Sequence, residues 1–207
     1  MNKLVTEFIG TLFLVLTIGC CVVGSNAGVI PPLAIASVLM VMIYAGGHVS
    51  GAHYNPAVTL GVVVRGRCSP ADAIGYMVAQ VAGAVVAALL VGFLKPGAAV
   101  APMALETNRA LISEALFTFA LVYVVLNVAT AKATANNSFY GAAIAGTVLA
   151  GAFAVGGISG GAFNPAVAVG ISVMGIASWS NLWIYLVGNF GGALAAALVF
   201  KKLNPND

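Results

Sequence analysis

The sequence contains the tripeptide Asn-Pro-Ala twice, and these residue types suit a helix start that also binds a neutral oxygen. Asn is a favoured helix N-cap and Pro is tolerated in the first helical turn, so a short helix is predicted to begin at each Asn. The first N–H groups of such a helix are unpaired and carry about half a positive charge. With the Asn amide, they can hold a water or alcohol oxygen and repel a cation. The two motifs are Asn55, Pro56, Ala57 and Asn164, Pro165, Ala166.

No pattern for enzymatic chemistry accompanies these motifs. There is no Ser/His/Asp arrangement and no phosphate-binding loop, and both histidines, His48 and His53, are assigned to one predicted loop. Cys20 and Cys21 are adjacent and Cys68 stands alone, so the cysteines offer neither metal-ligand spacing nor a disulfide framework. We therefore expect no enzymatic activity, no cofactor and no metal site.

The composition places the motifs in a membrane. Of the 207 residues, 61% are hydrophobic and only 6% are charged, against roughly 25% charged in soluble domains. Residues 8–64 and 133–200 contain no Asp, Glu, Lys or Arg. Because a spanning helix needs only ~20 apolar residues, each stretch must hold more than one span.

Gly, Pro and Asn-Pro breakers divide the apolar stretches into spans and shorter remainders. The first span lacks a convincing cleavage site and is expected to be resident rather than a signal peptide. The predicted spans are 4–24, 31–47, 71–94, 109–130, 139–157 and 181–201. The remaining segments, 55–63 and 164–172, are too short to cross, and each starts at an Asn-Pro.

The chain repeats itself at a spacing of 109 residues, the distance between Asn55 and Asn164. The block GGHVSGAHYNPAVTLG matches GGISGGAFNPAVAVG, and YMVAQVAGAVVAALL matches YLVGNFGGALAAALV. Each half holds three spans, an odd number, so the second half must enter the membrane inverted. We expect one all-α transmembrane domain over 1–207, with halves 1–98 and 99–207. It would be an inverted 3+3 repeat of six transmembrane helices plus two re-entrant half-helices.

Positive charges orient the predicted spans. Six of the eight Lys and Arg residues fall on the side of the chain ends: Lys3, Arg65, Arg67, Lys132, Lys201 and Lys202. The positive-inside rule then predicts a multi-pass protein of the cell membrane with both termini in the cytoplasm. The net charge of +3 is too small and too scattered to indicate nucleic acid. The expected partners are the lipid bilayer, water and small neutral solutes.

Glycine-rich stretches precede both motifs, at 46–54 and 156–163. Non-helical backbone survives in hydrocarbon only where it is buried in protein or lines water, so we expect these stretches to line a pore with their carbonyl groups. Tight connectors between helices are the alternative that Gly also permits. His53 either reaches a vestibule or is satisfied within its loop. The expected pore-lining residues are Gly51, Ala52, His53, Gly160 and Ala162.

The paired motifs, with Glu7 and Glu114 in the first span of each half, resemble the aquaporin (major intrinsic protein) family over essentially the whole chain. The resemblance implies six tilted helices, two half-helices meeting at the pore centre, and a homotetramer with one pore per subunit. A charged residue inside a span marks function by default. The resemblance instead implies that Glu7 and Glu114 brace the re-entrant loops. Gln80 and Asn189, at equivalent repeat positions, are predicted to form interhelical hydrogen bonds.

The resemblance also defines an entrance ring of four side chains, and here the sequence departs from the family. Counting from the motifs assigns the ring to Ile35, Ala152, Gly161 and Val167. Family members commonly carry Arg where Val167 stands, and water-selective members carry Phe and His in the ring. An uncharged aliphatic ring predicts a wider entrance, although an apolar ring can also dewet. Ala168 replaces an acidic residue that glycerol-conducting members usually carry.

We therefore predict a passive channel for water and small uncharged solutes that excludes protons and ions at the paired turns. It is expected to be wider and less water-selective than a typical aquaporin. One alternative is an aquaglyceroporin-like or ammonia/urea channel with little water flux. An ion-coupled secondary transporter also has inverted repeats and broken helices, but is less favoured because ion coupling needs ionisable groups near the site.

Overall fold

Six long helices and two short ones make up the fold of the computed structural model, which describes residues 1–24 and 30–207. The long helices have 20 to 25 residues and are apolar enough to cross a membrane, as predicted. They are α1 (Asn2–Val22), α2 (Pro31–Ser50), α4 (Pro70–Leu94), α5 (Thr107–Ala129), α6 (Tyr140–Ser159) and α8 (Leu182–Leu203). The short helices are α3 (Pro56–Arg65) and α7 (Pro165–Val173), with 3₁₀ turns η1 (Lys132–Thr134) and η2 (Trp179–Asn181).

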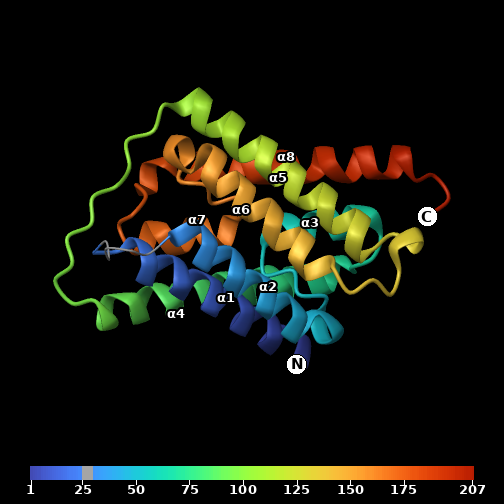
Figure 1. Cartoon of the computed structure of the whole chain (residues 1–207), viewed down its shortest axis with the longest axis horizontal. Helices are drawn as coiled ribbons and strands as arrows, with labels where there is room; N and C mark the ends of the chain where they lie inside the picture. The colour runs from blue at the N-terminus through green and yellow to red at the C-terminus, as the bar shows by residue number, and fades with distance from the viewer. Residues whose placement is uncertain (25–29) are drawn as a thin grey trace.

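The two halves pack in the same way. In the first half α1 packs against α4 and α2, and in the second half α5 packs against α8 and α6. Each short helix then crosses to the other half, since α3 packs against α8 and α7 packs against α4. Figure 1 shows the long helices running roughly side by side, with α3 and α7 among them. The predicted all-α inverted repeat is therefore confirmed.

Two repeat-related glycines allow the closest helix contacts. A Cβ atom at Gly83 of α4 would lie 2.5 Å from the carbonyl oxygen of Phe8 in α1. At Gly192 of α8, a Cβ atom would overlap the carbonyl oxygen of Ala115 in α5. Small residues at such contacts are typical of helix packing in membranes, where close backbone approach replaces the hydrophobic drive.

Large apolar side chains are exposed on the outer surface, as expected for a membrane protein. Ile74, Val78, Leu89 and Phe93 of α4 are all exposed, as expected for a face in contact with lipid. We call the end of the bundle that holds both chain ends and segment 130–139 the terminal face, and the end that holds segment 95–106 the opposite face (Figure 1).

The glycine-rich stretches are less irregular than predicted. Helix α2 continues to Ser50 and α6 to Ser159, so only residues 51–55 and 160–164 leave the helices before the motifs. The assignment of His48 to a loop is wrong, because it lies in the last turn of α2. Each helix ends at a glycine with positive φ, Gly51 and Gly160 (both +87°), a conformation that glycine adopts without strain.

Candidate functional site

Both Asn-Pro-Ala motifs form the predicted helix starts. The Asn55 Oδ1 accepts hydrogen bonds from the N–H groups of Ala57 (2.8 Å) and Val58 (3.4 Å), which caps α3. The Asn164 Oδ1 accepts from Ala166 (2.9 Å) and Val167 (3.3 Å) and caps α7 in the same way. The caps use the amide oxygens and leave the amide nitrogens for other partners.

Each amide nitrogen bonds to the other half of the chain. The Asn55 Nδ2 donates to the carbonyl oxygen of Phe163 (2.8 Å), and the Asn164 Nδ2 donates to that of Tyr54 (2.9 Å). An Asn amide carries two N–H donors, so one donor of each remains. Both asparagines line the central cavity, at 4% exposure. The two helix N-termini and two amide N–H groups therefore meet at one place.

The Glu7 side chain anchors the first loop, residues 51–55 between α2 and α3. Its fully buried carboxylate accepts four hydrogen bonds, from Ser50 Oγ (2.6 Å), His53 N (3.0 Å), Tyr54 N (2.7 Å) and Gln80 Nε2 (2.7 Å). Such a carboxylate is satisfied by donors alone, without a cation. Since these donors come from the loop, α2 and α4, Glu7 ties α1 to all three.

The Glu114 side chain anchors the second loop, residues 160–164 between α6 and α7, in the same way. It accepts from Ser159 Oγ (2.7 Å), Ala162 N (3.0 Å) and Phe163 N (2.7 Å). The Asn189 amide, oriented by its hydrogen-bond network, donates to Glu114 Oε2 (2.9 Å) and accepts from the backbone N–H of Asn164 (2.8 Å). The predicted interhelical bonds of Gln80 and Asn189 are thus present, and Asn189 also contacts the motif itself.

The loop carbonyl groups remain free. Within residues 1–24 and 30–207, no protein donor reaches the carbonyl oxygens of the residues 51–53 and 160–162, although the loop N–H groups bind Glu7 and Glu114. These residues line the cavity. Ala52, Tyr54 and Phe163 have φ angles of 51°, 50° and 48°, a left-handed conformation that is strained for residues other than glycine. Free acceptors beside a cavity suit a polar solute.

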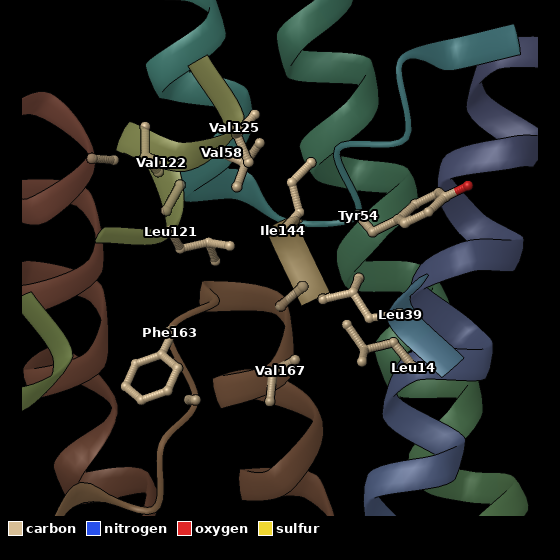
Figure 2. Close-up of a cluster of buried hydrophobic side chains, with 14 of the residues drawn as sticks. Leu14, Leu39, Tyr54, Val58, Leu121, Val122, Val125, Ile144, Phe163 and Val167 are labelled. Atoms are coloured by element: carbon tan, nitrogen blue, oxygen red, sulfur yellow. The ribbon is translucent and has the colours of Figure 1, made fainter. Parts of the chain in front are cut away.

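The cavity runs between the halves and has a volume of ≈ 460 Å³. Its lining extends from Pro31, at the start of α2, to Tyr140, at the start of α6. All four residues of the predicted entrance ring line it: Ile35, Ala152, Gly161 and Val167. The predicted pore-lining residues Gly51, Ala52, His53, Gly160 and Ala162 line it as well. Figure 2 shows Val58 above and Val167 below in the surrounding apolar cluster, with Ile144 between them and Leu39 to one side.

His53 is both satisfied and exposed to the cavity, so the two predicted alternatives coexist. Its Nδ1 lies 3.1 Å from Thr59 Oγ1, which also accepts from Gln80 Nε2 (3.1 Å) and donates to the Asn55 carbonyl oxygen (3.0 Å). The repeat-related positions in the second half are Ala162 and Ala168. This polar network is therefore present in one half only.

Sequence reasoning missed several residues that build the site. Tyr54 and Phe163 supply the carbonyls that bind the motif asparagines, and the hydroxyls of Tyr76 and Tyr185 donate to the carbonyls of Ser50 and Ser159 (both 2.8 Å). Each pair recurs at the 109-residue spacing, so repetition was the available signal. Among the described residues, no group of three or more His, Cys, Asp or Glu is placed to hold a metal.

Inverted halves, half-helices whose capping asparagines meet, and loops with free carbonyls define a multi-pass membrane channel. The chain belongs to the major intrinsic protein family, whose profile matches residues 1–200. It is 35% identical to aquaporin NIP1-4 of Oryza sativa subsp. japonica over 212 residues, which cover 98% of this chain and 77% of that protein.

Two further comparisons extend this likeness. The chain is 34% identical to glycerol uptake facilitator protein-like 6 of Lactiplantibacillus plantarum, and the match covers 100% of both chains. The X-ray structure of the aquaglyceroporin from Plasmodium falciparum has the same fold, with a TM-score of 0.83 at 20% sequence identity, covering 98% of this chain and 96% of that one.

Proposed function

We propose that this protein is a passive channel for water and small uncharged solutes, closed to protons and ions where Asn55 and Asn164 meet. The observation that carries the proposal is the pair of amide N–H donors left at the N-termini of α3 and α7. A solute oxygen there would accept both donors and turn its own hydrogens outward. The orientation interrupts a proton wire, and the positive helix ends repel cations.

The free carbonyls on either side support the same function. They can replace part of the hydration shell of a solute that enters the cavity, which lowers the cost of leaving bulk water. Flux would then follow concentration gradients alone. The acidic groups nearest the motifs, Glu7 and Glu114, accept hydrogen bonds from the protein and need no coupling ion.

The entrance ring is proposed to be open and uncharged, because Val167 stands where family members commonly carry Arg. The Val167 side chain adds neither a charge nor a hydrogen-bond donor to the cavity, so water has no advantage there over larger neutral solutes. We expect wild-type proteoliposomes to pass water, glycerol and urea in stopped-flow light scattering. Val167→Arg should suppress glycerol and urea by about tenfold and water by less.

Val167→Met is the matched control for side-chain bulk, since it lengthens the side chain without a charge. It should reduce solute flux less than Val167→Arg does. A wild-type channel that passes water but neither solute would contradict the proposal, and flux that depends on sodium or a proton gradient would indicate a coupled transporter instead.

A second candidate, a solute facilitator with little water flux, is favoured by the apolar walls of the cavity. Leu14, Ile18, Leu39 and Val125 line it alongside the ring residues, and apolar walls can dewet. The relative named as a glycerol uptake facilitator fits this candidate. The ratio of water to glycerol permeability in the same vesicles separates the two candidates.

The assembly and orientation are also proposals. The terminal face carries most of the Lys and Arg residues and would lie in the cytoplasm of a cell-membrane protein, by the positive-inside rule. By family resemblance the protein would form a homotetramer with one pore per subunit, and residues 1–98 and 99–207 would be the two halves of each pore.

A further inference from the structure

We propose that the size limit of the pore is set by a second ring near the terminal face, which we call the terminal-side ring: Ile43, Ala52, Val58 and Ile144. The proposal rests on the channel function above and adds where that channel selects. It places the limit on the other side of the asparagine pair from the entrance ring. Solutes of different sizes would then enter from the opposite face, and only the smaller ones would pass beyond the asparagines.

The inverted repeat defines this ring. Shifting the entrance ring by the 109-residue spacing carries Ile35 to Ile144 and Val167 to Val58. The same shift carries Ala152 to Ile43 and Gly161 to Ala52. All four members of the terminal-side ring line the cavity. The two rings are therefore equal at two positions, and the terminal-side ring is bulkier at the other two.

The side chains of the terminal-side ring are also more deeply buried than those of the entrance ring. The side chains of the terminal-side ring are nearly closed to water, with exposures of 2% for Ile43, 4% for Val58, 7% for Ile144 and 8% for Ala52. In the entrance ring only Val167, at 4%, is as buried, and the other three members are half-buried. A water-sized sphere thus reaches the entrance ring more easily than its counterpart.

The shape of the cavity is also consistent with a narrower pore on the terminal side. Toward the opposite face it continues unbroken beyond the entrance ring to Ala101, Met103 and Ile176. Toward the terminal face a separate hollow begins, and it shares only Gly51, Ala129 and Tyr140 with the pore cavity. The pore cavity thus meets a second hollow near Tyr140, as expected if the pore narrows on the terminal side.

Neighbouring residues add to the asymmetry. His53 and Tyr140 line the terminal side, where the repeat-related positions on the other side are Ala162 and Pro31. The helices α1 and α5 repeat at 107 residues, as Glu7 and Glu114 do, and Ala129 of α5 stands where α1 has Val22, so the α5 wall is slimmer. The narrowing therefore arises from α2, α6 and the first loop, which carry Ile43, Ile144 and Ala52, whereas Val58 of α3 has the same size as its counterpart Val167.

Ile144→Ala and Ile35→Ala test the proposal as a matched pair, because they make the same substitution at repeat-related positions. Proteoliposomes would be assayed by stopped-flow light scattering for urea, glycerol and erythritol, with flux normalised to reconstituted protein. Ile144→Ala should raise glycerol and erythritol permeability by roughly three- to tenfold, whereas Ile35→Ala should change it by less than about twofold. Urea, the smallest probe, should change least.

Ile43→Ala gives an independent test, since it makes the terminal-side position identical to Ala152 of the entrance ring. It should also raise erythritol permeability. If Ile144→Ala does not fold, judged by size-exclusion chromatography, Ile144→Val replaces it and should change permeability in the same direction by less.

The outcomes separate the ring from the channel function. A larger gain with Ile35→Ala, equal gains, or no gain in any variant would overturn the terminal-side ring, even if the wild type conducts urea. A wild type that passes no solute, with glycerol flux gained in Ile144→Ala, would support the ring and overturn the proposed solute conduction. Absence of flux in every protein would overturn both.

Discussion

At the scale of single residues, the site depends on two buried carboxylates that each accept several hydrogen bonds from the protein. Glu7 and Glu114 gather the N–H groups of loops whose backbone is strained at Ala52, Tyr54 and Phe163. Such strain, about 1–3 kcal/mol per residue, persists only where surrounding contacts over-determine the conformation. Because the carboxylates take the loop donors, the carbonyl acceptors are left for the cavity.

Glu7→Gln should destabilise the protein although it preserves side-chain volume. One carboxylate oxygen would become an NH₂ group facing two of the four present donors, which would then be buried and unpaired at about 1–3 kcal/mol each. We expect a loss of about 2–4 kcal/mol in the free energy of unfolding, measured by denaturant titration in mixed micelles.

Thr11→Val is the control for this change. Thr11 is also fully buried in α1, but its hydroxyl donates only to the Glu7 carbonyl oxygen within the same helix (2.8 Å). Such bonds add little to helix stability, so the loss should be under about 1 kcal/mol. Equal losses in both variants would show that Glu7 is not a brace.

At the scale of helices, repeat-related glycines set how closely α4 lies on α1 and α8 on α5. Gly83 and Gly192 face backbone carbonyls, which cannot move aside as a flexible side chain would. Close packing at these two contacts brings Gln80 and Asn189 within reach of the carboxylates.

Gly83→Ala should therefore destabilise the protein by about 1–3 kcal/mol, because its Cβ would overlap the Phe8 carbonyl and push α4 from α1. Gly92→Ala, in the same helix, is the control, since no atom lies within 4 Å of a Cβ there. The control should be neutral or stabilising, as alanine favours helix by up to about 1 kcal/mol. Thermal unfolding in detergent measures both, and a destabilised control would indicate a helix-wide effect.

The helices themselves were predictable because their signals are local. Apolar length, breakers and Asn caps identified all six spans and both short helices, with ends within a few residues. The predicted ends of α2 and α6 were too early because Gly46 and Gly156 resemble helix breakers. In the structure α2 continues to Ser50 and α6 to Ser159. A Cβ at Gly46 would overlap the Tyr54 hydroxyl, whereas nothing lies within 4 Å of a Cβ at Gly156. Sequence alone does not distinguish a glycine inside a helix from one that ends it.

The site was predictable only in part. The capping oxygens of Asn55 and Asn164 follow from a local motif, but their nitrogens bond to carbonyls about one hundred residues away. No local propensity encodes such a contact. No sequence motif marks Val58, Ile43 and Ile144. Only the 109-residue repeat relates them to the entrance ring.

At the scale of the whole molecule, a cluster of charges joins segments from both halves at the terminal face. Arg65, at the end of α3, pairs with Asp207 beyond α8 at 2.9 Å, and both side chains are about nine-tenths buried. Asp207 also accepts from the backbone N–H of Lys132 (3.1 Å), and Arg65 lies 5.0 Å from the ring centre of Phe200.

Asp207→Asn should lower the free energy of unfolding by about 2 kcal/mol, because it leaves the mostly buried Arg65 without its counter-charge. Glu106→Gln is the matched control. Its carboxylate caps α5, a role that the amide oxygen of Gln can keep, and pairs with the Arg109 side chain at 3.5 Å. Both side chains are more than half exposed, and such pairs contribute at most about 1 kcal/mol. Denaturant titration at low and high salt compares them, and similar small losses in both would mean that the buried pair does not join the halves.

The crossed bonds between the motif asparagines and the opposite loops bear on how the protein can be made. Among the residues that the structure describes, the Asn55 amide nitrogen donates to Phe163 and the Asn164 amide nitrogen to Tyr54, so each motif is completed by the other half. During synthesis the first three spans would enter the bilayer with Asn55 uncompleted. A conducting path then arises only once the second half has joined it, so a ribosome-bound chain would leave the membrane sealed until the second half has been synthesised.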